Sequence, residues 1–97
     1  MSRYIALIDG KVGAYGVVVP DLPGCTSGGK TMDEALRNAV EAVRLWAEDA
    51  RADGERLPKP RALEILRNDA ELWAALREGA ALAVVPLAAT FGNRGDD

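Results

Sequence analysis

The fold of this chain is decided by one proline- and glycine-rich segment, PDLPGCTSGGKTMDE, at residues 20–34. Proline presets turn dihedrals and glycine tolerates positive φ, so the chain must bend sharply here. Residues 25–28 are long enough for one short strand. Thr31 and Glu34 have the spacing of a capping box, in which the Glu34 carboxylate reaches back to the Thr31 N–H. The segment therefore separates a sheet-forming front from a helical rear.

Two strands are predicted before this segment. Residues 4–8, YIALI, are apolar at successive positions, which is typical of a central strand covered on both faces. Residues 15–19 form a second β-branched run behind a glycine-containing turn, so the pair reads as an antiparallel hairpin. Proline at position 20 lacks a donor and ends the second strand.

A long helix is predicted after the segment. Apolar residues recur at spacings of three and four over residues 36–50, which gives a wide apolar stripe over about five turns that must lie on the sheet. Gly54 is placed to end this helix as its C′ residue. The following LPKP at residues 57–60 is extended, because each proline disfavours helix in the residue before it.

The rest of the chain predicts a second helical stretch and a last strand. Helical spacing returns over residues 63–76, where Asn68-Asp69 is able to cap a break, and residues 81–85 form the strand. We expect this strand to pair in parallel with the first one after a right-handed helical crossover. The predicted fold is α+β (β-β-β-α-α-β), with three antiparallel strands, the fourth parallel to the first, strand order three-two-one-four and the helices on one face.

Composition limits the function. The 97 residues make one domain, with 48% hydrophobic and 28% charged residues as in globular proteins. We place this domain at residues 1–87 and a flexible polar tail at residues 88–97. Twelve basic and fifteen acidic residues give the chain a net charge of −3. A chain with this charge is not expected to carry the basic surface of a nucleic-acid binder.

Several residue types and segments are absent from the sequence. With no histidine and a single cysteine, Cys25, the usual neutral-pH acid/base, an internal disulfide and a cysteine-rich zinc site are excluded. Cys25 is expected to pack as a small apolar residue. No apolar run approaches the roughly 20 residues of a membrane span, and the start of the chain shows no signal peptide. We therefore expect a cytoplasmic protein without metal, cofactor or membrane contact.

The segment at residues 20–34 resembles the HicB antitoxin family. The family pattern has a strand pair that opens with tyrosine, a proline-aspartate-leucine-proline-glycine-cysteine turn, glycines, a threonine-capped helix, and then a glycine and a proline pair. The likeness extends from Tyr4 to about Pro86. Its structural motif comprises Pro20, Asp21, Leu22, Pro23, Gly24, Cys25 and Thr31.

The resemblance implies a partly degenerate ribonuclease H-like domain of a type II toxin-antitoxin system. Such a domain binds a small basic RNA-cleaving toxin of the HicA type and blocks its active site. Family members often continue into an operator-binding domain, whereas only eleven residues follow Pro86 here. We therefore expect no C-terminal DNA-binding domain and no direct DNA binding. The alternative is a stand-alone regulatory or adaptor module of the same fold without a toxin.

The long helix is the candidate toxin-binding surface. Residues 31–56 hold seven acids against four arginines, which favours attraction to a basic toxin. The alternative is that these charges are the solvated face of an amphipathic helix. Trp46 and Trp73 both lie on apolar stripes, and Trp46 is at the edge of its stripe. The candidate toxin-binding residues are Asp33, Glu34, Glu41, Glu48 and Trp46.

The fold also raises a nuclease hypothesis, because ribonuclease H-type enzymes hold two metal ions between carboxylates. The acids near the sheet are Asp9, Asp21, Asp33 and Glu34. A metal ligand is needed at the centre of the first strand, but Asp9 lies at the end of that strand. Asp33 and Glu34 are explained by helix capping. We therefore expect no enzymatic activity.

The second face of the predicted sheet needs cover. With all helices on one face, the other face is closed by a homodimer or a larger homo-oligomer. The candidate contact residues are Ile5, Leu7, Val18 and Leu22.

Overall fold

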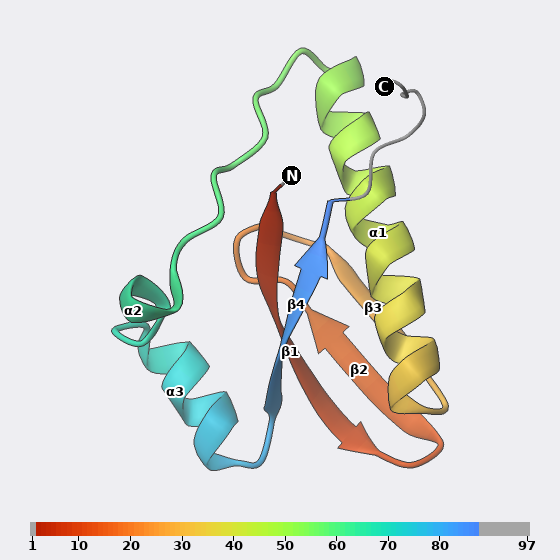
Figure 1. Cartoon of the computed structure of the whole chain (residues 1–97), viewed down its shortest axis with the longest axis vertical. Coiled ribbons are helices and arrows are strands. Elements are labelled where there is room, and N and C mark those ends of the chain that lie inside the picture. The colour runs from red at the N-terminus through yellow and green to blue at the C-terminus, as the bar shows by residue number, and fades with distance from the viewer. Residues whose placement is uncertain (1, 88–97) are drawn as a thin grey trace.

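The computed structural model describes residues 2–87, which form one four-stranded sheet and three helices (Figure 1). The predicted tail at residues 88–97 lies outside the described residues. The sheet has the order β3-β2-β1-β4. The elements are β1 (Arg3–Lys11), β2 (Ala14–Val18), β3 (Thr26–Gly29), α1 (Met32–Ala52), α2 (Leu63–Leu66), α3 (Ala70–Arg77) and β4 (Ala81–Pro86).

The sheet is antiparallel throughout, so the prediction that the fourth strand runs parallel to the first is wrong. β4 does lie beside β1, but Ile8 pairs with Ala81 and Arg3 with Pro86. The chain crosses the sheet lengthwise twice after β3, once through α1 and once through the linker, α2 and α3 (Figure 1). β4 therefore starts at the end where β1 finishes, and the sheet does not match the expected ribonuclease H-like one.

The main core lies between α1 and one face of the sheet. Side chains alternate along β1, so Tyr4, Ala6 and Ile8 are all buried on this face. From α1, the buried residues that reach this core cluster are Ala35, Ala39 and Val43. Small side chains on α1 let the helix approach the sheet closely. The helix predicted after the capping threonine is thus confirmed.

The prediction that the helices lie on one face is wrong. Alternation along β1 places Leu7 on the face turned away from α1, and Leu7 pairs with Val18 of β2. These two residues line a cavity together with Leu72 and Ala75 of α3. The sheet accordingly lies between α1 on one side and α2 and α3 on the other (Figure 1).

The linker between α1 and α2 takes α3 to that second face. Gly54, with φ of 76°, ends α1 as predicted, and the Glu55 N–H donates to the Ala50 carbonyl at 2.8 Å. The Tyr4 hydroxyl then donates to the Pro58 carbonyl at 2.6 Å and fixes the linker beside β1. Burial raises the pKa of the Tyr4 hydroxyl, which therefore stays protonated as a donor.

The helix starts follow the sequence signals with one difference. The Glu34 N–H donates to the Thr31 hydroxyl at 3.0 Å, as expected for the cap. The Glu34 carboxylate, however, accepts from the Lys30 N–H at 2.6 Å rather than from that of Thr31. The predicted break is confirmed, because the Asp69 side chain caps α3.

Candidate functional site

The turn at residues 20–25 is a compact structural corner. The Leu22 N–H donates to the Val19 carbonyl at 3.0 Å, and the Cys25 N–H donates to the Leu22 carbonyl at 2.9 Å. Leu22 is only 1% exposed and packs in the core, so the expectation that it contacts a neighbouring subunit is corrected. Cys25 is also buried, as predicted, and burial raises the pKa of its thiol.

The turn is tied to the linker by an ion pair whose acid is buried. The Asp21 side chain is 4% exposed and pairs with Arg61. One carboxylate oxygen accepts from the Arg61 backbone N–H at 2.7 Å, and the other accepts from its Nε at 2.5 Å. No sequence signal indicated this pair, because forty positions separate the two residues. The pair fixes where the chain enters α2.

The two tryptophans differ in their surroundings. The Trp46 indole N–H donates to the Pro23 carbonyl at 2.9 Å, and its ring packs partly buried against the core. Trp73 of α3 is 38% exposed, and its indole N–H donates to the Arg67 carbonyl. Trp46 therefore braces the turn against α1, and Trp73 is the more accessible of the two.

The candidate acids of α1 are partly engaged with other groups. Arg44 forms ion pairs with both Glu41 and Glu48, and its hydrogen bond lowers the pKa of Glu41. Glu34 bonds to the Lys30 N–H, whereas Asp33 is exposed in the first turn. Because α1 carries compensating arginines, its outer face offers less free negative charge than the count of acids suggested.

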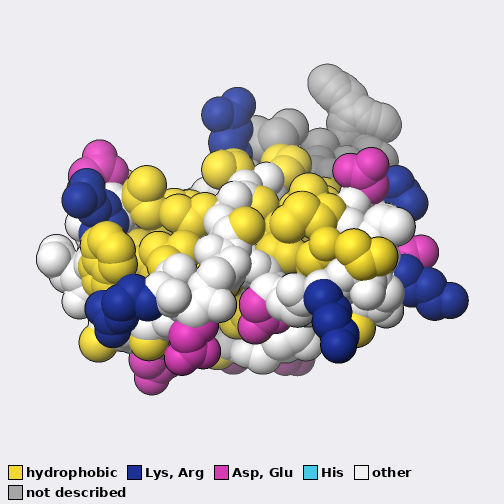
Figure 2. Space-filling model, turned by 90° about the horizontal axis from the view of Figure 1, so that it is seen from below, with side chains coloured by type: hydrophobic (Ala, Val, Ile, Leu, Met, Phe, Trp, Pro, Cys, Tyr) yellow, Lys and Arg dark blue, Asp and Glu magenta, His cyan; other side chains and the backbone are white. Residues whose placement is uncertain are grey.

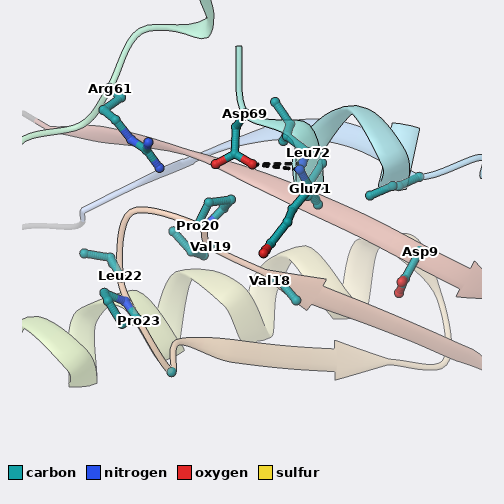
Figure 3. Close-up of a pocket in the computed structure, with 14 residues that line it drawn as sticks. Asp9, Val18, Val19, Pro20, Leu22, Pro23, Arg61, Asp69, Glu71 and Leu72 are labelled. Atoms are coloured by element: carbon teal, nitrogen blue, oxygen red, sulfur yellow. Dashed lines mark hydrogen bonds between the residues drawn. The ribbon is translucent and has the colours of Figure 1, made fainter. Parts of the chain in front are cut away.

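A cavity of about 390 Å³ lies between α3 and the sheet. Its walls contain apolar residues of β1, β2, the turn at residues 20–25 and α3, including Leu7, Val18 and Leu72. Three acids also line it, Asp9 from β1 and Asp69 and Glu71 from the start of α3. Figure 3 shows the Glu71 side chain extending from α3 toward Val18, with Asp9 farther along the strands.

The sheet face turned away from α1 carries exposed apolar side chains. Val84, 59% exposed, lies opposite the half-buried Ile5, and the exposed Leu82 lies opposite Leu7. Val18 is also exposed on this face. In Figure 2, hydrophobic side chains cover the middle of the lower end of the molecule, and charged side chains surround them. Ile5, Leu7 and Val18, the candidate oligomer-contact residues, thus lie on the same face of the sheet, where Leu7 and Val18 also line the cavity beside α3.

The acids considered as metal ligands are not brought together. Within residues 2–87, no group of three or more aspartate, glutamate, cysteine or histidine side chains is placed to hold a metal ion. Asp21 forms an ion pair with Arg61, and the Glu34 carboxylate accepts from the Lys30 N–H. The same part of the chain contains no helix with the length and apolar character needed to cross a membrane.

Comparison with families and relatives gives consistent matches. The model of the HicB_like antitoxin of bacterial toxin-antitoxin systems matches residues 4–90. An uncharacterized 14.9 kDa protein of Haemophilus phage HP1 is 46% identical over 57 residues, which are 59% of this chain and 43% of that protein. A UPF0150 protein of Thermoplasma acidophilum is 47% identical over 65 residues, 67% of this chain and 94% of that protein.

Solved structures agree with the family match. The antitoxin HicB of Burkholderia pseudomallei aligns with a TM-score of 0.71 and 32% identity over 89% of this chain and 63% of that one. Its N-terminal domain alone aligns with a TM-score of 0.69 and 32% identity, over 89% of this chain and 98% of the domain. A chain of a HicA3 and HicB3 toxin-antitoxin complex aligns with a TM-score of 0.69 and 28% identity, over 87% and 95% of the two chains. The chain thus spans less than two thirds of that HicB chain and under half of the phage protein.

Proposed function

Because the chain belongs to the HicB-like antitoxin family of bacterial toxin-antitoxin systems, we propose that it binds a small basic toxin of the HicA type and occludes its RNA-cleaving site. The observation that carries this proposal is the likeness of nearly the whole chain to one in a solved toxin-antitoxin complex. The net charge of −3 supports it, since an acidic surface steers a basic partner.

The proposed action is binding rather than catalysis. Two of the acids near the start of α1 and the turn serve the fold, because Glu34 holds the Lys30 N–H just before α1 and Asp21 holds the linker. The cavity between α3 and the sheet combines apolar and acidic side chains, so its charge is complementary to a basic partner. The toxin is expected to lose activity because its site is covered.

The test is co-expression with the product of a neighbouring short reading frame that encodes a basic protein. We expect that protein to arrest growth alone, and growth to recover when this chain is present. A toxin variant that has lost its RNA-cleaving activity serves as the control, because it should still co-purify without arresting growth. Failure of both co-purification and rescue would contradict the antitoxin role and favour an adaptor module without a toxin.

We also infer that a second copy of the chain covers the apolar sheet face. Val84 and Leu82 are exposed there beside Ile5, and a soluble monomer rarely leaves such a continuous patch open. Val84→Asp is expected to convert a dimer to a monomer in sedimentation at micromolar concentration. Val12→Asp is the matched control, because Val12 is 82% exposed in the β1–β2 turn, away from this face. A monomeric wild-type chain would rule out this interface.

A further inference from the structure

We propose that the cavity between α3 and the sheet receives one arginine side chain presented by a protein partner. The partner class rests on the proposed function, because a basic toxin is a source of such arginines. The site itself is argued from the cavity, its apolar floor and the charge of its edge.

The floor of the cavity suits an aliphatic stem. Leu7 and Val18 contribute from the sheet, and Leu72 and Ala75 contribute from α3. The volume of about 390 Å³ is near the lower end of the range for small ligand sites, about 300–1,000 Å³. Arginine buries its methylene stem along apolar surface and keeps its charged end at a polar edge. One side chain of this kind therefore matches the floor.

The charged groups of the cavity favour a cation. Arg61 is the basic residue among the lining side chains, and it is already paired with Asp21. Within residues 2–87, no ion pair joins Asp9, Asp69 or Glu71 to a basic side chain. Three carboxylates of this part of the chain therefore line the cavity outside any ion pair: Asp69 and Glu71 at the start of α3, and Asp9 farther along β1 (Figure 3).

The arrangement favours arginine over an apolar or anionic anchor. An apolar anchor would desolvate the carboxylates without pairing them, and an anion would be repelled. One Asp69 oxygen already accepts from the Glu71 and Leu72 N–H groups at 2.9 and 3.2 Å, so its second oxygen and the whole Glu71 carboxylate are the available acceptors. A planar guanidinium presents several donors in a fixed fork and is weakly hydrated, which suits pairing with a carboxylate at the edge of an apolar cavity.

The experiment uses a small probe and needs no toxin. The ¹⁵N-labelled 97-residue chain is titrated with the capped tripeptide acetyl-Gly-Arg-Gly-amide. In parallel it is titrated with the same peptide carrying citrulline in place of arginine, because citrulline is nearly isosteric and neutral. We expect saturable shifts of the Leu7, Val18, Leu72 and Ala75 amide signals with the arginine peptide only. The double variant D9N/E71Q should weaken binding about fivefold, as expected for two partly exposed charge contacts. Glu55→Gln removes an exposed acid away from the cavity and should leave binding unchanged.

The outcomes separate this proposal from the proposed function. Equal binding of the citrulline peptide, shifts confined to the α1 acids, or no shifts at millimolar peptide would each overturn the arginine site. A toxin complex unaffected by D9N/E71Q would also overturn it while leaving the antitoxin role intact. Arginine-specific binding without any toxin complex would support the site and contradict the antitoxin role alone.

Discussion

Replacing Gly29 with alanine is expected to destabilise the fold by about 3 kcal/mol, the upper part of the usual range for overpacking. A Cβ at this position would lie 2.6 Å from the Ala35 backbone nitrogen and 3.0 Å from its Cα. These are backbone atoms of the first turn of α1, which cannot rotate away as a side chain can. β3 and α1 must therefore separate, and that separation opens the core at Ala35 and Ala39.

Thermal unfolding followed by circular dichroism measures this effect, and about 3 kcal/mol corresponds to a fall of roughly 15 °C in Tm for a domain of this size. Gly16→Ala is the matched control, because it is the same substitution in the same sheet. Its Cβ would meet only an Asp9 side-chain oxygen at 3.1 Å, which is free to move. Equal Tm values for the two variants would show that β3 and α1 do not pack as closely as described.

The glycines near this contact show where sequence reasoning was limited. In the segment at residues 20–34, positive φ was expected of the glycines, and Gly24 indeed has φ of 82°. Gly28 and Gly29 instead lie in β3 and are required by close approach of backbone, to Tyr15 and to Ala35. Conformational freedom is a local property that sequence can indicate. Interatomic space depends on the neighbouring element, which sequence alone does not place.

The same distinction separates the confirmed elements from the wrong ones. The strands, the α1 cap and the break before α3 follow from signals within a few residues, and all are present. The direction of β4 depends on whether the chain crosses the sheet once or twice. That path is set by contacts such as the Tyr4 hydroxyl with Pro58, fifty-four positions apart. The wrong prediction for the direction of β4 then led to the wrong prediction that the helices lie on one face of the sheet.

The candidate site was only partly predictable for the same reason. The acids of α1 are readable from helical spacing, although Arg44 proved to pair with two of them. The cavity is built by β1, β2, the turn and α3, and no local pattern joins Asp9 to Glu71. The break at Asp69 was visible in the sequence. That Asp69 lines a cavity could not be predicted, because the cavity depends on which face of the sheet α3 covers.

Replacing Asp21 with alanine is the second substitution with a large expected effect, a loss of about 3 kcal/mol. The carboxylate accepts two hydrogen bonds from Arg61, and a bond to a charged group contributes about 1.5–3 kcal/mol. Alanine removes both bonds and leaves the part-buried Arg61 N–H without this acceptor. Because this contact fixes the entry to α2, its loss should also release α2 and α3 from the sheet.

Hydrogen exchange distinguishes that release from a uniform loss of stability. In Asp21→Ala, the amides of α2 and α3 should exchange faster than those of β1 and β2, and binding of the arginine peptide should disappear with the wall of its cavity. Asp21→Asn keeps one oxygen acceptor for the Arg61 N–H, so its exchange rates and its peptide binding should lie between those of the wild-type protein and those of Asp21→Ala. Glu48→Ala breaks an exposed ion pair on α1 and should leave both exchange and peptide binding unchanged. If Asp21→Ala behaves like Glu48→Ala, the ion pair with Arg61 does not hold the cavity in place, because the loss of a buried acid would then matter no more than the loss of an exposed one.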